Sequence, residues 1–139
     1  MPPDYLTGLL GIQGYRVIAV EPIGNESERG LVRVHLERTR RGHFCSGCGQ
    51  GALQGYDHTW QELRHLPLWQ HQTIVRFQRY RVDCPDCGVR TEALEFADVR
   101  GPRVTRALSA LVYELCKVTT VKASALLFGL HRPTVTDID

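Results

Sequence analysis

Two cysteine pairs of the same form constrain the fold of this chain more than any other feature. One occupies residues 45–49 (Cys-Ser-Gly-Cys-Gly) and the other residues 84–88 (Cys-Pro-Asp-Cys-Gly). Two thiolates three positions apart grip one ion from a tight turn, and the following glycine supplies the positive φ that such a turn needs. Two such turns offer the closed tetrahedral set of a structural zinc site. The sequence therefore predicts one structural Zn²⁺ with the ligands Cys45, Cys48, Cys84 and Cys87.

Other uses of these thiols stay open at this point. The same four-sulfur cage also binds iron, and ligand types alone do not separate the two metals. Two disulfides or redox-active thiols are the remaining alternatives, although a redox pair does not need a second copy. Histidines beside the pairs could replace a cysteine ligand; these are His43, His58, His65 and His71. We expect the fifth cysteine, Cys116, to be a small buried residue.

The 139-residue chain allows one ordinary domain or two small ones. Its start lacks the charged and apolar regions of a secretory signal, and no apolar run is long enough to span a bilayer. We therefore expect a cytoplasmic protein with no membrane partner. Because cytosol is reducing, paired cysteines there favour metal over disulfide.

The first part of the chain reads as β structure. Residues 15–21 and 31–38 are expected strands of a hairpin around a turn at 22–30, and residues 61–66 form a short extended piece that Pro67 closes. Residues 72–83 are the longest expected strand, with an imperfect alternation that indicates a twist or bulge. We predict a small antiparallel, zinc-ribbon-like unit over residues 1–98. Three aromatic side chains are expected beside the zinc, or alternatively as stacking surfaces for single-stranded bases: Trp60, Trp69 and Phe77.

Residues 99–139 read as helical. A stripe of Val104, Leu108, Leu111 and Leu115 predicts one amphipathic helix. A second helix is expected over 121–128, capped by Thr119 or Thr120 and ended by Gly129, and a third starts near Pro133. A helix-turn-helix needs a small contact residue, a turn glycine and apolar seating residues. Five positions supply them: Ala125, Gly129, Leu130, Val135 and Ile138. An ordinary helical hairpin is the alternative, and the predicted fold class is α+β with a three-helix tail, truncated in its last helix.

The order of these parts resembles the N-terminal region of bacterial insertion-sequence transposases of the IS-L-three family. The resemblance rests on Gly-Tyr-Arg-Val at 14–17, the first cysteine pair, Arg-His-Leu-Pro at 64–67, the basic strand 79–84 and the tail. Ser46 stands where this family usually has proline. The resemblance implies a zinc finger and helix-turn-helix that recognise the terminal inverted repeats of the mobile element. It also implies an Asp-Asp-Glu nuclease domain for strand transfer, which the given sequence does not contain.

Basic side chains suggest the partner. The formal net charge is only +2, but 15 of the 17 positive residues are arginine, whose forks suit phosphate and guanine. A GC-rich genome would also enrich arginine. We predict that the basic clusters before the two cysteine pairs hold phosphates and that the last helix reads bases. The predicted DNA-binding residues are Arg38, Arg40, Arg41, Arg76, Arg79, Arg81, Arg103, Arg132, Thr134 and Thr136.

The predicted function is thus sequence-specific double-stranded DNA binding in transposition and DNA recombination. The alternative is a zinc-dependent protein-interaction or oligomerisation module, and the sequence leaves homo-oligomerisation open. A Gly-rich phosphate loop and a His-Glu-x-x-His motif are absent, and no acid pairs convincingly with a base. We therefore expect neither catalysis nor a small-molecule substrate.

Overall fold

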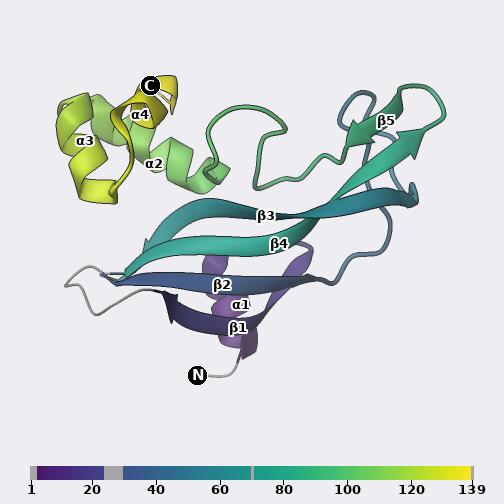
Figure 1. The fold of residues 1–139 in the computed structure, drawn as a ribbon, viewed down its shortest axis with the longest axis horizontal. Helices are drawn as coiled ribbons and strands as arrows, with labels where there is room; N and C mark the ends of the chain where they lie inside the picture. The colour runs from purple at the N-terminus through teal and green to yellow at the C-terminus, as the bar shows by residue number, and fades with distance from the viewer. Residues whose placement is uncertain (1–2, 24–29, 70, 139) are drawn as a thin grey trace.

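The computed structural model describes residues 3–23, 30–69 and 71–138, with side chains from residue 7 onward. It is an α+β fold with one sheet, in which one helix precedes the strands along the chain and three helices follow them (Figure 1). The elements are α1 (Pro3–Leu10), β1 (Tyr15–Ile23), β2 (Leu31–Arg38), β3 (Gly55–Leu68), β4 (His71–Cys84), β5 (Gly88–Thr91), α2 (Arg106–Cys116), α3 (Val121–Phe128) and α4 (Arg132–Ile138).

The sheet is mixed, so the predicted purely antiparallel unit is wrong. Its strand order is β1-β2-β4-β3, with β5 paired to β4. The pairs β1–β2, β3–β4 and β4–β5 are antiparallel, but β2 and β4 run parallel. Because β2 leads into the first cysteine pair and β4 ends on the second, both strands must run toward the same end of the sheet for the pairs to meet. Parallel pairing follows from that requirement.

The β3–β4 hairpin is the longest feature of the sheet. β3 spans 14 residues rather than the six predicted, and it continues through Pro67. The register shifts between His65 and Leu68, and this irregular end of the strand accommodates a residue with no amide hydrogen. A second shift between Gly55 and Asp57 adds one residue to β3 opposite the end of β4. There the burial of β4 changes phase, from every second residue up to Arg79 to Val82 and Cys84, in agreement with the imperfect alternation predicted for this strand. Most of the turn predicted at 22–30 falls outside the described residues.

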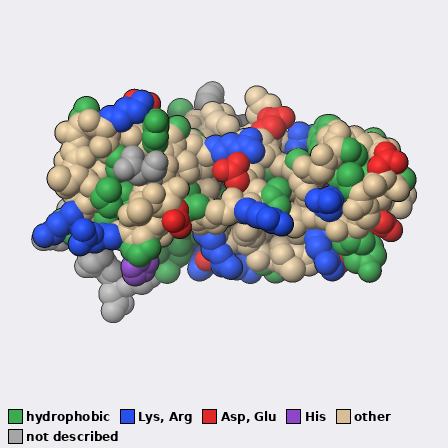
Figure 2. All heavy atoms as spheres, turned by 90° about the horizontal axis from the view of Figure 1, so that it is seen from above, with side chains coloured by type: hydrophobic (Ala, Val, Ile, Leu, Met, Phe, Trp, Pro, Cys, Tyr) green, Lys and Arg blue, Asp and Glu red, His purple; other side chains and the backbone are tan. Residues whose placement is uncertain are grey.

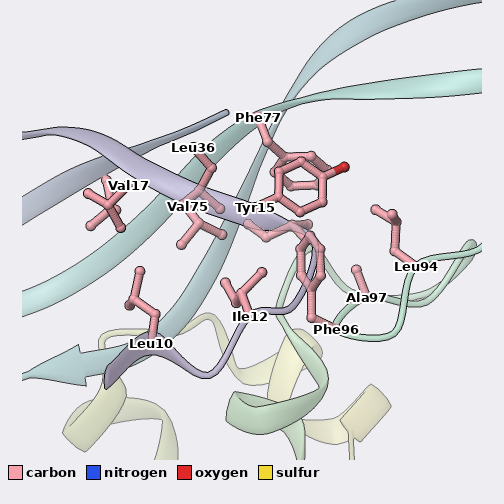
Figure 3. Close-up of a cluster of buried hydrophobic side chains, with 12 residues drawn as sticks. Leu10, Ile12, Tyr15, Val17, Leu36, Val75, Phe77, Leu94, Phe96 and Ala97 are labelled. Atoms are coloured by element: carbon pink, nitrogen blue, oxygen red, sulfur yellow. The ribbon is translucent and has the colours of Figure 1, made fainter. Parts of the chain in front are cut away.

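The main core lies between the sheet, the segment after α1 and the loop at 94–97. Tyr15, Phe77 and Phe96 lie against one another at its centre (Figure 3), with ring centroids 5.2 to 5.7 Å apart and edge-to-face angles. Phe77 is fully buried, whereas Trp60 and Trp69 are 54% and 83% exposed. Phe77 belongs to the main core and not to the cluster beside the cysteines, so the predicted aromatic core beside the zinc is wrong.

The helical tail has its own core, formed by one face of each of its three helices. Its buried members are Val104, Leu108, Val112, Ala125, Phe128 and Val135. The stripe predicted for the first tail helix is partly wrong, because Leu111 is exposed and Val112 is buried. The helix begins at Arg106, so Val104 of the predicted stripe lies before it, and Thr105 is its N-cap. Thr120 caps α3 and Gly129 ends it in the left-handed conformation, as predicted.

The tail packs against one end of the sheet, and the cysteine pairs lie at the other. In Figure 1 the helices α2, α3 and α4 lie at the left end and β5 at the right. The hairpin β3–β4 runs between them, and 14 extended residues span roughly 40 Å. Among the described residues, no helix combines the length and the apolar character needed to cross a lipid bilayer.

Candidate metal centre

Four cysteine sulfurs come together at the end of β4. The Sγ atoms of Cys45, Cys48, Cys84 and Cys87 all lie within 4.8 Å of one another. The first pair sits in the turn after β2, and the second joins β4 to β5. Buried Val82 and partly buried Leu53 pack beside the sulfurs. Four thiols from two turns make the closed ligand set of a structural zinc.

The local backbone is built to carry sulfur charge. The amide of Gly47 donates to the Sγ atom of Cys45 at 3.3 Å. The amides of Cys48 and Gly47 lower the pKa of Cys45 to about 6. Gly49 and Gly88 both take positive φ, 77° and 79°, which confirms the predicted role of the glycine after each pair.

The remaining thiols show why the site needs a cation. The neighbouring Cys48 thiol and then burial raise the pKa of Cys87 to about 12. For Cys48, the amide of Gln50 favours the thiolate, but the Cys84 thiol and burial outweigh it and raise its pKa. Four negative sulfurs in one place repel one another unless a dication neutralises them. The donor set and its crowding therefore fit one Zn²⁺.

Gly47 lies in the close packing around the sulfurs. A Cβ atom at this position would lie 3.0 Å from the Sγ atom of Cys87 and 3.2 Å from the Nε atom of Arg90. A side chain at residue 47 would therefore need Cys87 or Arg90 to shift by a few tenths of an ångström. The sequence pattern did not single out this glycine, which lies between the two cysteines of the first pair.

A buried carboxylate beside the metal centre was missed by sequence reasoning. The Glu92 side chain is 1% exposed and accepts from Arg38, from the ring of His43 and from the backbone amide of Tyr80. Residue 92 also forms an isolated β-bridge with Cys45. Glu92 thus ties β2, β4 and the first cysteine turn together. Glu92 follows the second cysteine turn, and nothing near it in the sequence distinguishes it from an acid on the protein surface.

Three of the four histidines beside the pairs have other partners. The Nδ1 atom of His43 lies 2.6 Å from the Oε2 atom of Glu92, and His58 packs on the ring of Tyr80. His65 bonds to Thr105 and to the carbonyl of Leu10. In the described part of the chain, the four cysteines are the group of metal-ligating side chains that comes together this closely.

Two predicted DNA contacts have partners within the protein, and one of them is buried. Arg79 is 5% exposed and donates to the carbonyls of Glu92 and Asp98. Arg38 is 16% exposed at its side chain and pairs with Glu92. Arg79 is thus buried with its guanidinium bonded to backbone carbonyls, and Arg38, which is partly buried, directs its charge to Glu92. Arg79 follows the buried positions Thr73, Val75 and Phe77 on the same face of β4.

The other predicted arginines are nearer to solvent but mostly paired. Arg76 pairs with Glu62 and lies over the Trp60 ring, with 4.6 Å between its Cζ atom and the ring centroid. Arg81 forms a two-pronged pair with Asp57, and Arg40 lies over the Phe44 ring. Arg41 and Arg103 are exposed. In the tail, Arg132 and Thr136 are exposed on α4, and Thr134 is half-buried.

Comparison with known proteins agrees with the metal centre. Residues 41–87 match the family model described as the zinc-finger of transposase IS204/IS1001/IS1096/IS1165. Over 135 residues the chain is 30% identical to the transposase for insertion sequence element IS1001 of Bordetella parapertussis, a match that covers 96% of this chain and 32% of that protein. The chain thus spans about a third of this curated relative. No solved structure matches it. By these two matches the chain is similar to the zinc-finger region of transposases of the IS-L-three family.

Proposed function

We propose that this chain binds double-stranded DNA as the end-recognising part of a transposase of this family. The observation that carries the proposal is the turn between α3 and α4 in a chain with transposase relatives. Gly129 ends α3 at φ 61°, ψ 35°, and α4 begins three residues later. Ala125 and Val135 are buried where the two helices meet. A turn glycine, a small contact residue and a buried seating residue are features of a helix-turn-helix, and they support the proposal.

The exposed face of α4 offers side chains for base or phosphate contacts. Arg132 and Thr136 lie one helical turn apart, and both are exposed. Arginine reads guanine with two hydrogen bonds, and threonine contacts either base or phosphate. We assign α4 to the major groove, with half-buried Thr134 at its margin.

The zinc end of the sheet supplies the second contact in this proposal. Its exposed basic side chains are Arg41, Arg81 and Arg90. Figure 2 shows Lys and Arg side chains in separate groups along one face, from the end with the tail helices to the end with β5. The two ends are roughly 40 Å apart along β4, close to one turn of B-DNA, about 34–36 Å. The zinc end would hold phosphates and the tail would read bases.

Under this proposal residues 1–98 are the zinc-bound support and residues 99–139 the reading unit. Recognition of terminal inverted repeats is the specific form of the proposal. The transposase activity belongs to a relative of which this chain spans 32%, so we assign no strand-transfer step to these residues.

Selection from a random duplex library tests the proposal. Zinc-loaded protein is expected to enrich one sequence motif, and Arg132→Gln is expected to change the motif or abolish enrichment. Arg16→Gln is the matched control, because Arg16 is an exposed arginine paired with Glu37 on the sheet. Enrichment of no motif by the wild-type chain would contradict sequence-specific binding.

A second candidate function is zinc-dependent assembly with another copy or another protein. Exposed apolar side chains on the tail favour it: Val118, Leu126 and Leu127 are 81%, 64% and 56% exposed. An exposed apolar patch often marks a protein interface. Light scattering on zinc-loaded protein with and without duplex separates the two functions. A Leu126→Asp variant that becomes monomeric would support assembly.

A further inference from the structure

The side chain of Arg64 joins the sheet to the end of a tail helix. Its Nη2 atom donates to the carbonyl of Phe128 at 2.5 Å, and its Nη1 atom donates to the carbonyl of Gly129 at 3.3 Å. These carbonyls end α3, where the helix has no amide left to pair them and carries partial negative charge. A guanidinium at this position donates hydrogen bonds to the unpaired carbonyls and also neutralises the partial negative charge.

Gln72 on the neighbouring strand holds this arginine in place. Its Oε1 atom accepts from the Nη2 atom of Arg64 at 2.6 Å, and its Nε2 atom donates to the carbonyl of Leu127 at 3.4 Å. Two side chains from β3 and β4 thus contact three successive carbonyls at the end of α3.

The same stretch of β3 also holds the start of the tail. The amide of Arg64 donates to the carbonyl of Arg103 at 3.0 Å, and the amide of Thr105 donates to the carbonyl of Arg64 at 2.8 Å. The Nδ1 atom of His65 lies 2.7 Å from the Oγ1 atom of Thr105, the N-cap of α2. Leu66 packs into the tail core. The tail is therefore fixed where it begins and again where α3 ends.

We propose that Arg64 is a positioning residue for DNA binding, which sets the placement of α4 relative to the zinc end of the sheet. This inference rests on the proposed function. Only two residues, Leu130 and His131, separate Gly129 from α4, so a fixed α3 end also fixes α4. Because the tail and the zinc end are then held at a fixed distance, the affinity for DNA depends on the spacing between their two contact sites on the duplex. Without Arg64 the tail can reorient relative to the sheet, and the affinity depends less on that spacing.

The test combines one DNA series with one measurement on the protein alone. The probe is the duplex enriched by the wild type, together with versions that carry 5 or 10 inserted base pairs at the centre of the footprint. For the wild type, 5 inserted base pairs rotate one contact to the opposite side of the duplex and are expected to weaken binding at least about tenfold. Arg64→Gln is expected to bind the parent duplex more weakly and to lose little further affinity on insertion. Arg16→Gln, with the same charge change, is expected to keep the wild-type pattern.

Amide hydrogen exchange on the zinc-loaded protein reports positioning without DNA. In Arg64→Gln the amides of Gly129 and Leu130, which close the end of α3, are expected to exchange faster, while those of Val75 and Phe77 in the sheet stay protected. Gln72→Leu is the second variant, because it leaves Arg64 in place and is expected to show the same two effects more weakly. An Arg64→Gln protein with the wild-type insertion penalty and unchanged exchange at 129–130 would overturn the inference. Failure of the wild type to select any duplex would instead overturn the proposed function, and with it the DNA part of this inference.

Discussion

The Nδ1 atom of His43 lies 2.6 Å from the Oε2 atom of Glu92, inside the molecule. His43 precedes the first zinc ligand, Cys45, by two residues. The other carboxylate oxygen of Glu92 accepts from Arg38 and from the amide of Tyr80. Both side chains are more than nine-tenths buried. One carboxylate therefore links the end of β2, the approach to the first cysteine turn and the end of β4.

Glu92→Gln is expected to destabilise the zinc-loaded protein by about 3–5 kcal/mol, because it leaves the buried Arg38 charge without its partner. Urea unfolding followed by circular dichroism measures the change in the free energy of unfolding. Glu37→Gln is the control, because Glu37 pairs with Arg16 on the surface, and its loss is expected to cost less than about 1 kcal/mol. Equal effects from the two variants would contradict a structural role for the buried carboxylate.

Zinc binding is expected to release protons. At pH 7 the metal-free Cys45 thiol is largely ionised, since its pKa is about 6, whereas raised pKa values keep Cys48 and Cys87 protonated. Zinc must displace the protons of those two thiols, so zinc affinity falls as the pH falls. Calorimetry in buffers of different ionisation enthalpy measures the number released. Release of fewer than two protons would contradict this account of the site.

Cysteine replacements separate the zinc ligands from the fifth cysteine. Cys84→Ser is expected to lose zinc and the fold around residues 41–91, because for a small metal site binding energy is folding energy. Cys116→Ser is expected to keep one zinc per chain, because the Cys116 thiol faces Ser124 in the tail. Metal analysis of the folded proteins distinguishes the two. Retention of zinc by Cys84→Ser would show that the ligand set is wrong.

His65 is expected to make stability depend on pH. Burial lowers the pKa of His65, although the carbonyl of Leu10 partly opposes that shift. The carbonyl accepts from Nε2, so the neutral ring can accept from the Thr105 hydroxyl at Nδ1. The unfolded chain takes up a proton near pH 6.5 and the folded chain only at lower pH. The contribution of His65 is therefore complete above about pH 6.5 and is lost as the pH falls toward its folded pKa.

The measurement for His65 is urea unfolding between pH 7.5 and pH 5 with zinc in excess, in the wild type and in His65→Gln. The variant is expected to be less stable at pH 7.5 and to lose less stability on acidification. His58→Gln, at an exposed position, controls for removal of a histidine. Parallel pH profiles for the wild type and His65→Gln would exclude His65 as the cause.

Arg79 and Arg81 are expected to behave differently although they lie two residues apart. Arg79→Gln removes buried hydrogen bonds to the carbonyls of Glu92 and Asp98 and is expected to destabilise the fold by about 2–3 kcal/mol. Arg81→Gln changes an exposed pair, so its main expected effect is weaker binding to every duplex, with a salt slope lower by about 1. Unfolding and DNA titration on both variants measure this contrast. If Arg79→Gln instead weakened DNA binding without loss of stability, Arg79 would be a DNA contact.

Local signals in the sequence predicted much of the site and the tail. The cysteine spacing specified the metal centre, and Thr120 and Gly129 marked the ends of α3, because caps and tight turns depend on a few neighbouring residues. The direction of β4 beside β2 depends on residues far apart in the chain. The parallel direction of the two strands could have been deduced, because the cysteine pairs that follow β2 and end β4 must lie at the same end of the sheet to bind one ion.

Burial of charged residues was the main difficulty. Arg79 was predicted as a phosphate contact because it belongs to the basic cluster before the second cysteine pair. Its burial depends on hydrogen bonds to the carbonyls of Glu92 and Asp98, which lie in a later segment. Glu92 itself gave no local signal. Buried charges find partners through the tertiary fold, which periodicity and spacing do not describe.

Hydroxyl-radical footprinting of the zinc-loaded chain on its selected duplex tests the central claim most directly. The claim is that the tail and the zinc end of one sheet contact the same DNA at two places. The account predicts two protected segments whose centres lie about one helical turn, roughly 10 base pairs, apart. It also predicts that Arg132→Gln weakens one segment and that Arg41→Gln weakens the other. A single short protected segment that both variants affect equally would contradict the account.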